Sequence, residues 1–320
     1  MAAASGLRRS SRIAPWPGGH LATTPGEKIT MSRRISAALA VAALTCTTAA
    51  VAATPASAAA PNVPTSCRAH WGASTSTGAY YWYTYANQRA TATRVSTNRI
   101  GWRPTAEVQV GAYGDTGSFT NEQVATSQGG KLMTITRKGV ERNGVWAVSQ
   151  STRTVKSSGW TGTRALATDG RYLYRLHGGY LTRYPISWTS TGSLKVGSAT
   201  RIGSGYGNMR SIVYERSGTV SGKTIDVLLH NVSSGALREL RVPRSAPTQR
   251  TYATLRWTGF QNFRSLTTAP CGSKGRSIGG LTDGDRMYVY YDPTAADSRG
   301  TDIRGGWTGK GGFALQAYGQ

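Results

Sequence analysis

Residues 159–184 read GWTGTRALATDGRYLYRLHGGYLTRY and hold the pattern from which the architecture follows. A Gly-Trp-Thr-Gly opening leads into a short apolar run and then into two runs of alternating apolar and polar residues. Asp169-Gly170 and Gly178-Gly179 separate these runs, and such pairs mark the tight turns of β-hairpins. The stretch therefore predicts three short antiparallel strands in succession.

Related stretches recur along the chain at intervals of 58, 46, 51 and 50 residues. The five openings are Gly101-Trp102, Gly159-Trp160, Gly205-Tyr206, Arg256-Trp257 and Gly306-Trp307. Three openings continue as Trp-Thr-Gly, and a short apolar strand and a hairpin follow. Units of about four strands at a period near fifty residues are typical of β-propeller blades.

The two ends of the chain complete one further unit. After Trp307 there is room for a single strand, whereas the strands expected at 79–85 and 92–95 lack an opening. Joined, residues 307–320 and 59–101 make one unit. The chain is thus predicted to be all-β, a five-bladed β-propeller whose last blade is closed by N- and C-terminal strands. A β-sandwich or a trefoil is the alternative.

Residues 1–58 are expected to lie outside the folded domain. A charged segment from Met31, an apolar run over 35–53 and the small residues Ala56-Ser57-Ala58 predict a secretory signal peptide, with Met31 as a plausible start. A single membrane anchor is the alternative. Cleavage leaves 59–320 as one propeller domain without a run long enough to span a membrane. We therefore predict a secreted, extracellular monomer.

The number and spacing of cysteine and histidine residues limit which disulfide and metal sites the chain can form. Cys67 and Cys271 remain after cleavage, and an even number in an exported chain predicts one disulfide. His70, His177 and His230 are scattered, and neither H-E-x-x-H nor Cys-x-x-Cys occurs, so we expect no metal site. P-loop and dinucleotide fingerprints are also absent from the sequence, and no cofactor is expected.

The chain is strongly basic. Its 320 residues include 38 Lys+Arg against 14 Asp+Glu, a formal net charge of +24, together with 40 Gly, 9 Trp and 16 Tyr. A disordered chain would lack so many aromatic side chains, and a coiled coil would need far more Glu, Lys and Leu. Such a charge attracts polyanions, among them anionic cell-envelope polymers. The expected export and the lack of a nucleic-acid-binding motif argue against nucleic acid as the partner.

The repeat openings carry the candidate ligand-binding residues. Sugar sites combine an aromatic face with amide, hydroxyl or charged groups, and the openings offer such sets. They are Trp160 with Arg164 and Asp169, Tyr206 with Asn208 and Arg210, Trp257 with Asn262 and Arg264, and Trp307. The alternative is that each aromatic side chain packs between neighbouring blades.

The openings and hairpins resemble those of the tachylectin-like five-bladed β-propeller lectins, including their secreted bacterial relatives. Three of the five openings match, at Trp160, Trp257 and Trp307. The resemblance implies non-catalytic binding of N-acetylated sugars at shallow sites, one for each blade, without a metal.

Two other functions stay open at this stage. Some propellers are glycosidases, which need two carboxylates about 5–10 Å apart. Asp169, Asp283 and Asp285 lie in turns where an aspartate caps its own backbone, and the glutamates cannot be paired from the sequence. A secreted propeller enzyme acting on polysaccharide is therefore one alternative. General adhesion to polyanions and cell walls is the other.

Overall fold

The computed structural model describes residues 55–56, 62–96, 99–115, 117–142, 145–310 and 315–319. Residues 53–320 form one compact unit. Apart from Pro55–Ala56, the predicted leader 1–58 lies outside the described residues and stays a prediction. The described part holds 22 strands and a single short 3-10 helix, η1 (Pro247–Gln249).

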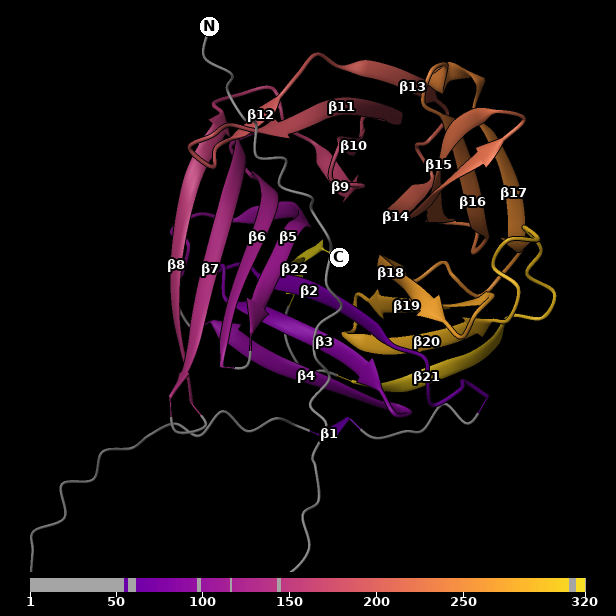
Figure 1. Cartoon of the computed structure of the whole chain (residues 1–320), viewed down its shortest axis with the longest axis horizontal. Coiled ribbons are helices and arrows are strands. Elements are labelled where there is room, and N and C mark those ends of the chain that lie inside the picture. Colours follow the sequence, from indigo (N-terminus) through magenta and orange to yellow (C-terminus); the bar gives the residue numbers. More distant parts are fainter. Residues whose placement is uncertain are drawn as a thin grey trace, which may run out of the picture. The chain divides into compact units, whose positions relative to one another are not determined.

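The strands form five antiparallel sheets, which we number as blades I to V (Figure 1). Blade I holds β1 (Pro55–Ala56), β2 (Ala69–Thr75), β3 (Tyr80–Ala86), β4 (Arg89–Ser96) and β22 (Leu315–Gly319). Blade II holds β5 (Pro104–Asp115), β6 (Ser118–Ser127), β7 (Leu132–Arg142) and β8 (Val145–Lys156). Blade III holds β9 (Thr163–Thr168), β10 (Tyr172–His177), β11 (Tyr180–Trp188), β12 (Leu194–Val196) and β13 (Thr200–Ser204).

The remaining two blades have four strands each. Blade IV holds β14 (Met209–Val220), β15 (Lys223–Val232), β16 (Leu237–Pro243) and β17 (Thr251–Arg256). Blade V holds β18 (Phe263–Cys271), β19 (Gly275–Thr282), β20 (Arg286–Asp292) and β21 (Arg304–Lys310). The innermost strand of each blade contacts the innermost strand of the next blade, in the order β22, β5, β9, β14 and β18 around the centre (Figure 1). The predicted five-bladed β-propeller is confirmed.

Blade I closes the ring as predicted. Its sheet order is β1-β4-β3-β2-β22, and β22 pairs antiparallel with β2, with Gly319 opposite Gly72. One detail of the prediction is wrong. Trp307 does not open the last unit but lies within β21, the outermost strand of blade V. The innermost strand of blade I begins only at Leu315.

Apolar clusters of described residues fill four of the interfaces between neighbouring blades. One joins blades I and V around Trp71 and Val289, and a second joins blades II and III around Val124 and Leu173. Two further clusters join blade III to blade IV and blade IV to blade V. Because fully burying a large apolar side chain contributes roughly 1.5–3 kcal/mol, these interfaces hold the radial sheets together.

A disulfide joins Cys67, just ahead of β2, to Cys271 at the end of β18, as the sequence predicted. It links blade V to blade I, the blade that holds both ends of the ring. Among the described residues no helix is long and apolar enough to cross a membrane. Nor does this part of the chain contain a group of three or more His, Cys, Asp or Glu side chains arranged to hold a metal ion.

Candidate binding site in the central cavity

A β-bulge interrupts the innermost strand of every blade at the same place. In blade IV, Met209 pairs with Val232 and Ser211 with Asn231, so Arg210 between them has no partner across the sheet. The same shift occurs near the start of the innermost strand in each blade. The bulged residues are Thr105, Arg164, Arg210, Arg264 and Gln316. Since a bulge re-aims the extra residue, this position is suited to presenting side chains toward a ligand.

An aromatic residue four positions earlier anchors three of these strands. Its backbone N–H donates to a glycine carbonyl in the hairpin turn of the preceding blade, at 2.9–3.0 Å. The pairs are Trp160 with Gly130, Tyr206 with Gly179 and Phe260 with Gly235. These glycines have φ of 75°, 77° and 99°, a conformation that L side chains rarely adopt. The hydrogen bond from each blade thereby fixes the position of the segment that leads to the bulged arginine of the next blade.

The Trp-Thr-Gly openings are therefore not equivalent in space. Trp160 is 5% exposed, and Phe260, not Trp257, occupies the matching buried position at 1% exposure. Trp257 lies three residues further from its arginine and is 74% exposed, while Trp307 is 52% exposed on β21. The distance to the bulge, rather than the triplet itself, decides which aromatic residue is buried.

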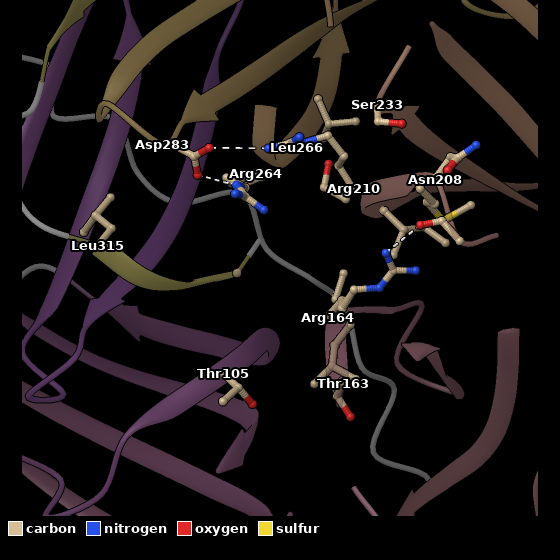
Figure 2. Close-up of a pocket in the computed structure, with 18 residues that line it drawn as sticks. Thr105, Thr163, Arg164, Asn208, Arg210, Ser233, Arg264, Leu266, Asp283 and Leu315 are labelled. Atoms are coloured by element: carbon tan, nitrogen blue, oxygen red, sulfur yellow. Dashed lines mark hydrogen bonds and ion pairs between the residues drawn. The ribbon is translucent and has the colours of Figure 1, made fainter. Parts of the chain in front are cut away.

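The bulged arginines surround a cavity of about 540 Å³. All five blades contribute to its lining, at the end where the innermost strands begin. Its polar side chains come mainly from blades III to V and are Thr105, Thr163, Arg164, Asn208, Arg210, Ser211, Ser233, Arg264, Ser265 and Asp283 (Figure 2). Apolar side chains that include Leu166, Ile212, Leu266 and Leu315 complete the lining. The cavity is a polar, cationic hollow on an apolar support.

Asp283 bridges two of the arginines (Figure 2). Its Oδ2 lies 3.4 Å from Nη2 of Arg210, and its Oδ1 accepts a hydrogen bond from Nε of Arg264. Nε of Arg210 is buried and has no hydrogen-bond partner among the described residues. One carboxylate is thus shared between two guanidinium groups.

Arg164 is held differently. Its Nη1 donates to the carbonyl oxygen of Gly207 at 2.8 Å, and its Nη2 donates to that of Tyr206 at 3.0 Å. Partial burial lowers the pKa of Arg164 from its usual value. The described ion pairs include no carboxylate for this guanidinium. The lining therefore carries three guanidinium groups against one carboxylate.

The structure brings four of the predicted site residues together in the cavity: Arg164, Asn208, Arg210 and Arg264. Tyr206 borders them, since its carbonyl holds Arg164 and its hydroxyl accepts a hydrogen bond from Arg250 at 2.8 Å. Trp257 and Asn262 are exposed outside the lining.

Trp160 and Asp169 lie outside the cavity lining, and each contacts an arginine side chain. The guanidinium carbon of Arg175 lies 4.6 Å from the centre of the Trp160 ring, and Arg175 donates to the carbonyls of Gly159 and Thr161 on either side of it. Asp169 lies in the turn between β9 and β10, at the opposite end of blade III from Arg164. Its Oδ2 accepts from Nη2 of Arg244 at 2.8 Å.

Sequence reasoning missed several polar lining residues, among them two in hairpin turns, Ser233 and Asp283. They occupy the same place in equivalent hairpin turns, β15–β16 and β19–β20, and Asp283 was interpreted only as a turn residue. A signal existed. Because the strands are antiparallel, the second hairpin turn of a blade lies at the same end as the start of its innermost strand.

A second group of buried charges lies between blades IV and V. Arg276 Nη1 lies 2.5 Å from Glu215 and 3.4 Å from Glu239, and its Nη2 lies 2.8 Å from Asp292. Burial raises the pKa of Glu215 and of Asp292. These carboxylates are neutralised by arginine where they stand, and they do not line the cavity.

Comparisons with known proteins leave the site to be interpreted from its own geometry. No family model matches the chain, and no curated protein matches it. The chain is similar to the solved structure of BBS1N in complex with ARL6DN, soaked with lead, with 11% identity and a TM-score of 0.31 over 71% of this chain and 75% of that one. It is also similar to the periplasmic gluconolactonase PpgL of Pseudomonas aeruginosa, with 12% identity and a TM-score of 0.31 over 78% and 98%. Likenesses this low carry no argument about activity.

Proposed function

We propose that this protein is a non-catalytic carbohydrate-binding protein whose ligand sits in the central cavity. The observation that carries the proposal is one hollow of about 540 Å³ in which donors from three adjacent blades stand over an apolar lining. Small-molecule sites usually measure about 300–1,000 Å³ and combine apolar walls with a few placed polar groups.

The lining matches the chemistry of a sugar. Guanidinium N–H groups donate to hydroxyl oxygens, whereas the Asn208 amide and the Ser233 hydroxyl can both donate and accept. Leu315, a partly buried side chain of the lining, offers apolar surface to the C–H face of a ring. The described lining contains no aromatic side chain, unlike the platform that the repeat openings led us to expect.

Binding is favoured over catalysis by the carboxylates. Most glycoside hydrolases flank the scissile bond with two carboxyl groups, one of which acts as an acid. Asp283 is the sole carboxylate among the described residues that line the cavity, and two arginines already engage it. This supports a ligand that is held rather than cleaved.

The setting of the protein is part of the proposal. Disulfides persist in oxidising compartments, so the Cys67–Cys271 bond agrees with the predicted signal peptide. We accordingly place the protein outside the cell, as a monomer whose ligands are cell-envelope or other extracellular glycans, N-acetylated sugars among them.

A glycan array probed with the full chain tests this function. Asn208→Ala should abolish binding to the glycans that the wild type binds. Trp257→Ala and Asn262→Ala, both outside the cavity, should leave this binding unchanged. Loss of binding only in Trp257→Ala would move the site to the exposed openings. Release of reducing ends from a bound polysaccharide would establish an enzyme instead, and an array without any binding would overturn the proposal.

General polyanion adhesion is the second candidate, and the net charge of +24 favours it. Charge-driven surface binding fades as salt screens it, with a Debye length of about 8 Å at physiological ionic strength. Retention of the same glycans at high salt would exclude this candidate. Binding to every anionic polymer alike, lost at high salt, would establish it.

A further inference from the structure

We infer that the ligand of the central cavity carries an oxyanion, the carboxylate or phosphate of an acidic sugar, held by Arg164, Arg210 and Arg264. The inference rests on the proposed function and adds the chemical class of the ligand. Three observations support it: the shared position of the three arginines, the pairing of Asp283 with Arg210 and Arg264, and the lack of a carboxylate partner for Arg164 among the described ion pairs.

The three arginines share one structural position in three adjacent blades. Each is the bulged residue of its innermost strand, and β9, β14 and β18 follow one another around the centre. Thr105 of blade II, which also lines the cavity, is uncharged at the same position. The cavity therefore has a cationic side over blades III to V and a neutral hydroxyl group over blade II.

Asp283 shows that this cationic side accepts a carboxylate. Its two oxygens are divided between Arg210 and Arg264, which is how a ligand carboxylate would bridge the same two groups. The Asp283 side chain is 57% exposed, so solvent and solutes reach it. An acidic ligand would compete with Asp283 for these arginines or extend the same ion-paired cluster.

Arg164 adds a positive charge to the one that Asp283 leaves unneutralised between Arg210 and Arg264. A guanidinium has five N–H groups, and the two carbonyls of Tyr206 and Gly207 engage only two Nη atoms. Those bonds fix the plane of the group before a ligand arrives, so less side-chain entropy is lost on binding. The remaining N–H groups of Arg164 are suited to a second oxygen of the same anion.

A neutral sugar would use this site less well. It would leave two excess positive charges without a counter-charge beside the apolar lining, where water screens them less than in bulk. Hydrogen bonds to an ionised acceptor are roughly twice as strong as neutral ones. The site should therefore discriminate between an acidic sugar and its neutral counterpart of the same size.

Calorimetric titration of the full chain with matched oligosaccharides tests the inference. The probes are a glucuronate-ended and a glucose-ended oligosaccharide of equal length, glucose 1-phosphate and inorganic phosphate. We expect the glucuronate-ended or phosphorylated sugar to bind roughly ten- to a hundredfold more tightly than the glucose-ended one. Whichever of the two acidic sugars binds more tightly identifies the source of the oxyanion.

Charge-matched variants locate the effect. Arg164→Gln and Arg210→Gln should each remove most of the preference for the acidic sugar. Arg286→Gln, an exposed arginine outside the lining, should leave it unchanged although the net charge falls equally. Asp283→Asn should tighten binding of the acidic sugar several-fold but not that of the neutral one, a gain that a misfolded variant cannot produce.

The results distinguish a failure of the oxyanion site from a failure of the proposed carbohydrate binding. If the glucose-ended oligosaccharide binds equally well and Asn208→Ala abolishes both, the inference fails and the proposed function stands. If inorganic phosphate binds as tightly as the sugars, the oxyanion site stands and carbohydrate recognition fails. If none of the four probes binds, the inference fails, and the glycan array alone decides the proposed function.

Discussion

At the scale of single residues, the interior holds ionisable groups that tie stability to pH. Glu107 of β5 is fully buried between blades I and II. It accepts a hydrogen bond from Ser74 at 2.8 Å, and the charge of nearby Arg137 favours its ionised form. Burial outweighs both effects and raises the pKa of Glu107 from 4.5 to about 7.

Glu107 should make the protein lose stability as the pH rises. Its pKa is higher in the folded state, so its contribution is fully present below pH 4.5 and is lost as the pH rises through 7. The shift corresponds to about 3 kcal/mol. In Glu107→Gln, the fall in unfolding free energy between acidic and slightly basic pH should shrink by about that amount. Urea titrations measure this, with Glu141→Gln, an exposed site on the same blade, as control.

His230 should act in the opposite direction. Burial, with Arg238 nearby, lowers the pKa of His230 from 6.5 to about 3. Its contribution is therefore present above pH 6.5 and is lost as the pH falls toward 3, by up to about 5 kcal/mol. His230→Gln should unfold at a lower pH than the wild type in an acid titration followed by circular dichroism. An unchanged acid midpoint would show that another group drives acid unfolding.

At the scale of elements, the sequence was informative about strands and less so about their anchors. Asp-Gly and Gly-Gly pairs between alternating runs predicted the β9–β10–β11 meander, because turn chemistry and a period of two are local properties. Which aromatic residue is buried depends on its distance from the bulge. Trp257 and Phe260 are both plausible in isolation, and only the contact with Gly235 selects Phe260.

The candidate site could also be predicted only in part. Arg164, Arg210 and Arg264 could be found because each begins an apolar strand in the repeat. The antiparallel strand order could have placed the turn of Asp283 at the cavity end of blade V. Its pairing with Arg210 could not be foreseen, because it is a tertiary contact between blades V and IV without a local signal.

The three aromatic residues should differ sharply when truncated. Trp160→Ala and Phe260→Ala empty buried positions between blades and should each cost about 3–5 kcal/mol of unfolding free energy. Trp257→Ala removes an exposed side chain and should change it by less than about 0.5 kcal/mol. Urea unfolding curves of the three variants decide the matter. A large loss in Trp257→Ala would contradict the assignment of Phe260 as the anchor.

At the scale of the whole molecule, two features hold the ring at one seam. β22 pairs with β2 inside blade I, and the Cys67–Cys271 disulfide fastens the segment before β2 to blade V. The first lock is non-covalent and the second covalent. Together they restrain the interface at which an open propeller would separate.

Removing the covalent lock should weaken the fold without abolishing it. The double variant Cys67→Ser, Cys271→Ser should lose about 2–5 kcal/mol of unfolding free energy, because the disulfide restricts the unfolded chain. Thermal unfolding measures the loss, and the wild type under reducing conditions should match the variant. A variant as stable as the oxidised wild type would show that strand pairing alone secures the seam.

The pairing of Gly72 with Gly319 also sets the order in which the fold can be completed. These residues lie near the two ends of the domain's sequence, so the closing contact has a large loop-closure cost and is expected to form late. Until residues 315–319 have been synthesised, the inner edge of β2 stays unpaired and open to strands of other chains. A polypeptide that stops before residue 315 would keep that adhesive edge, so premature termination should yield aggregates rather than a four-bladed protein.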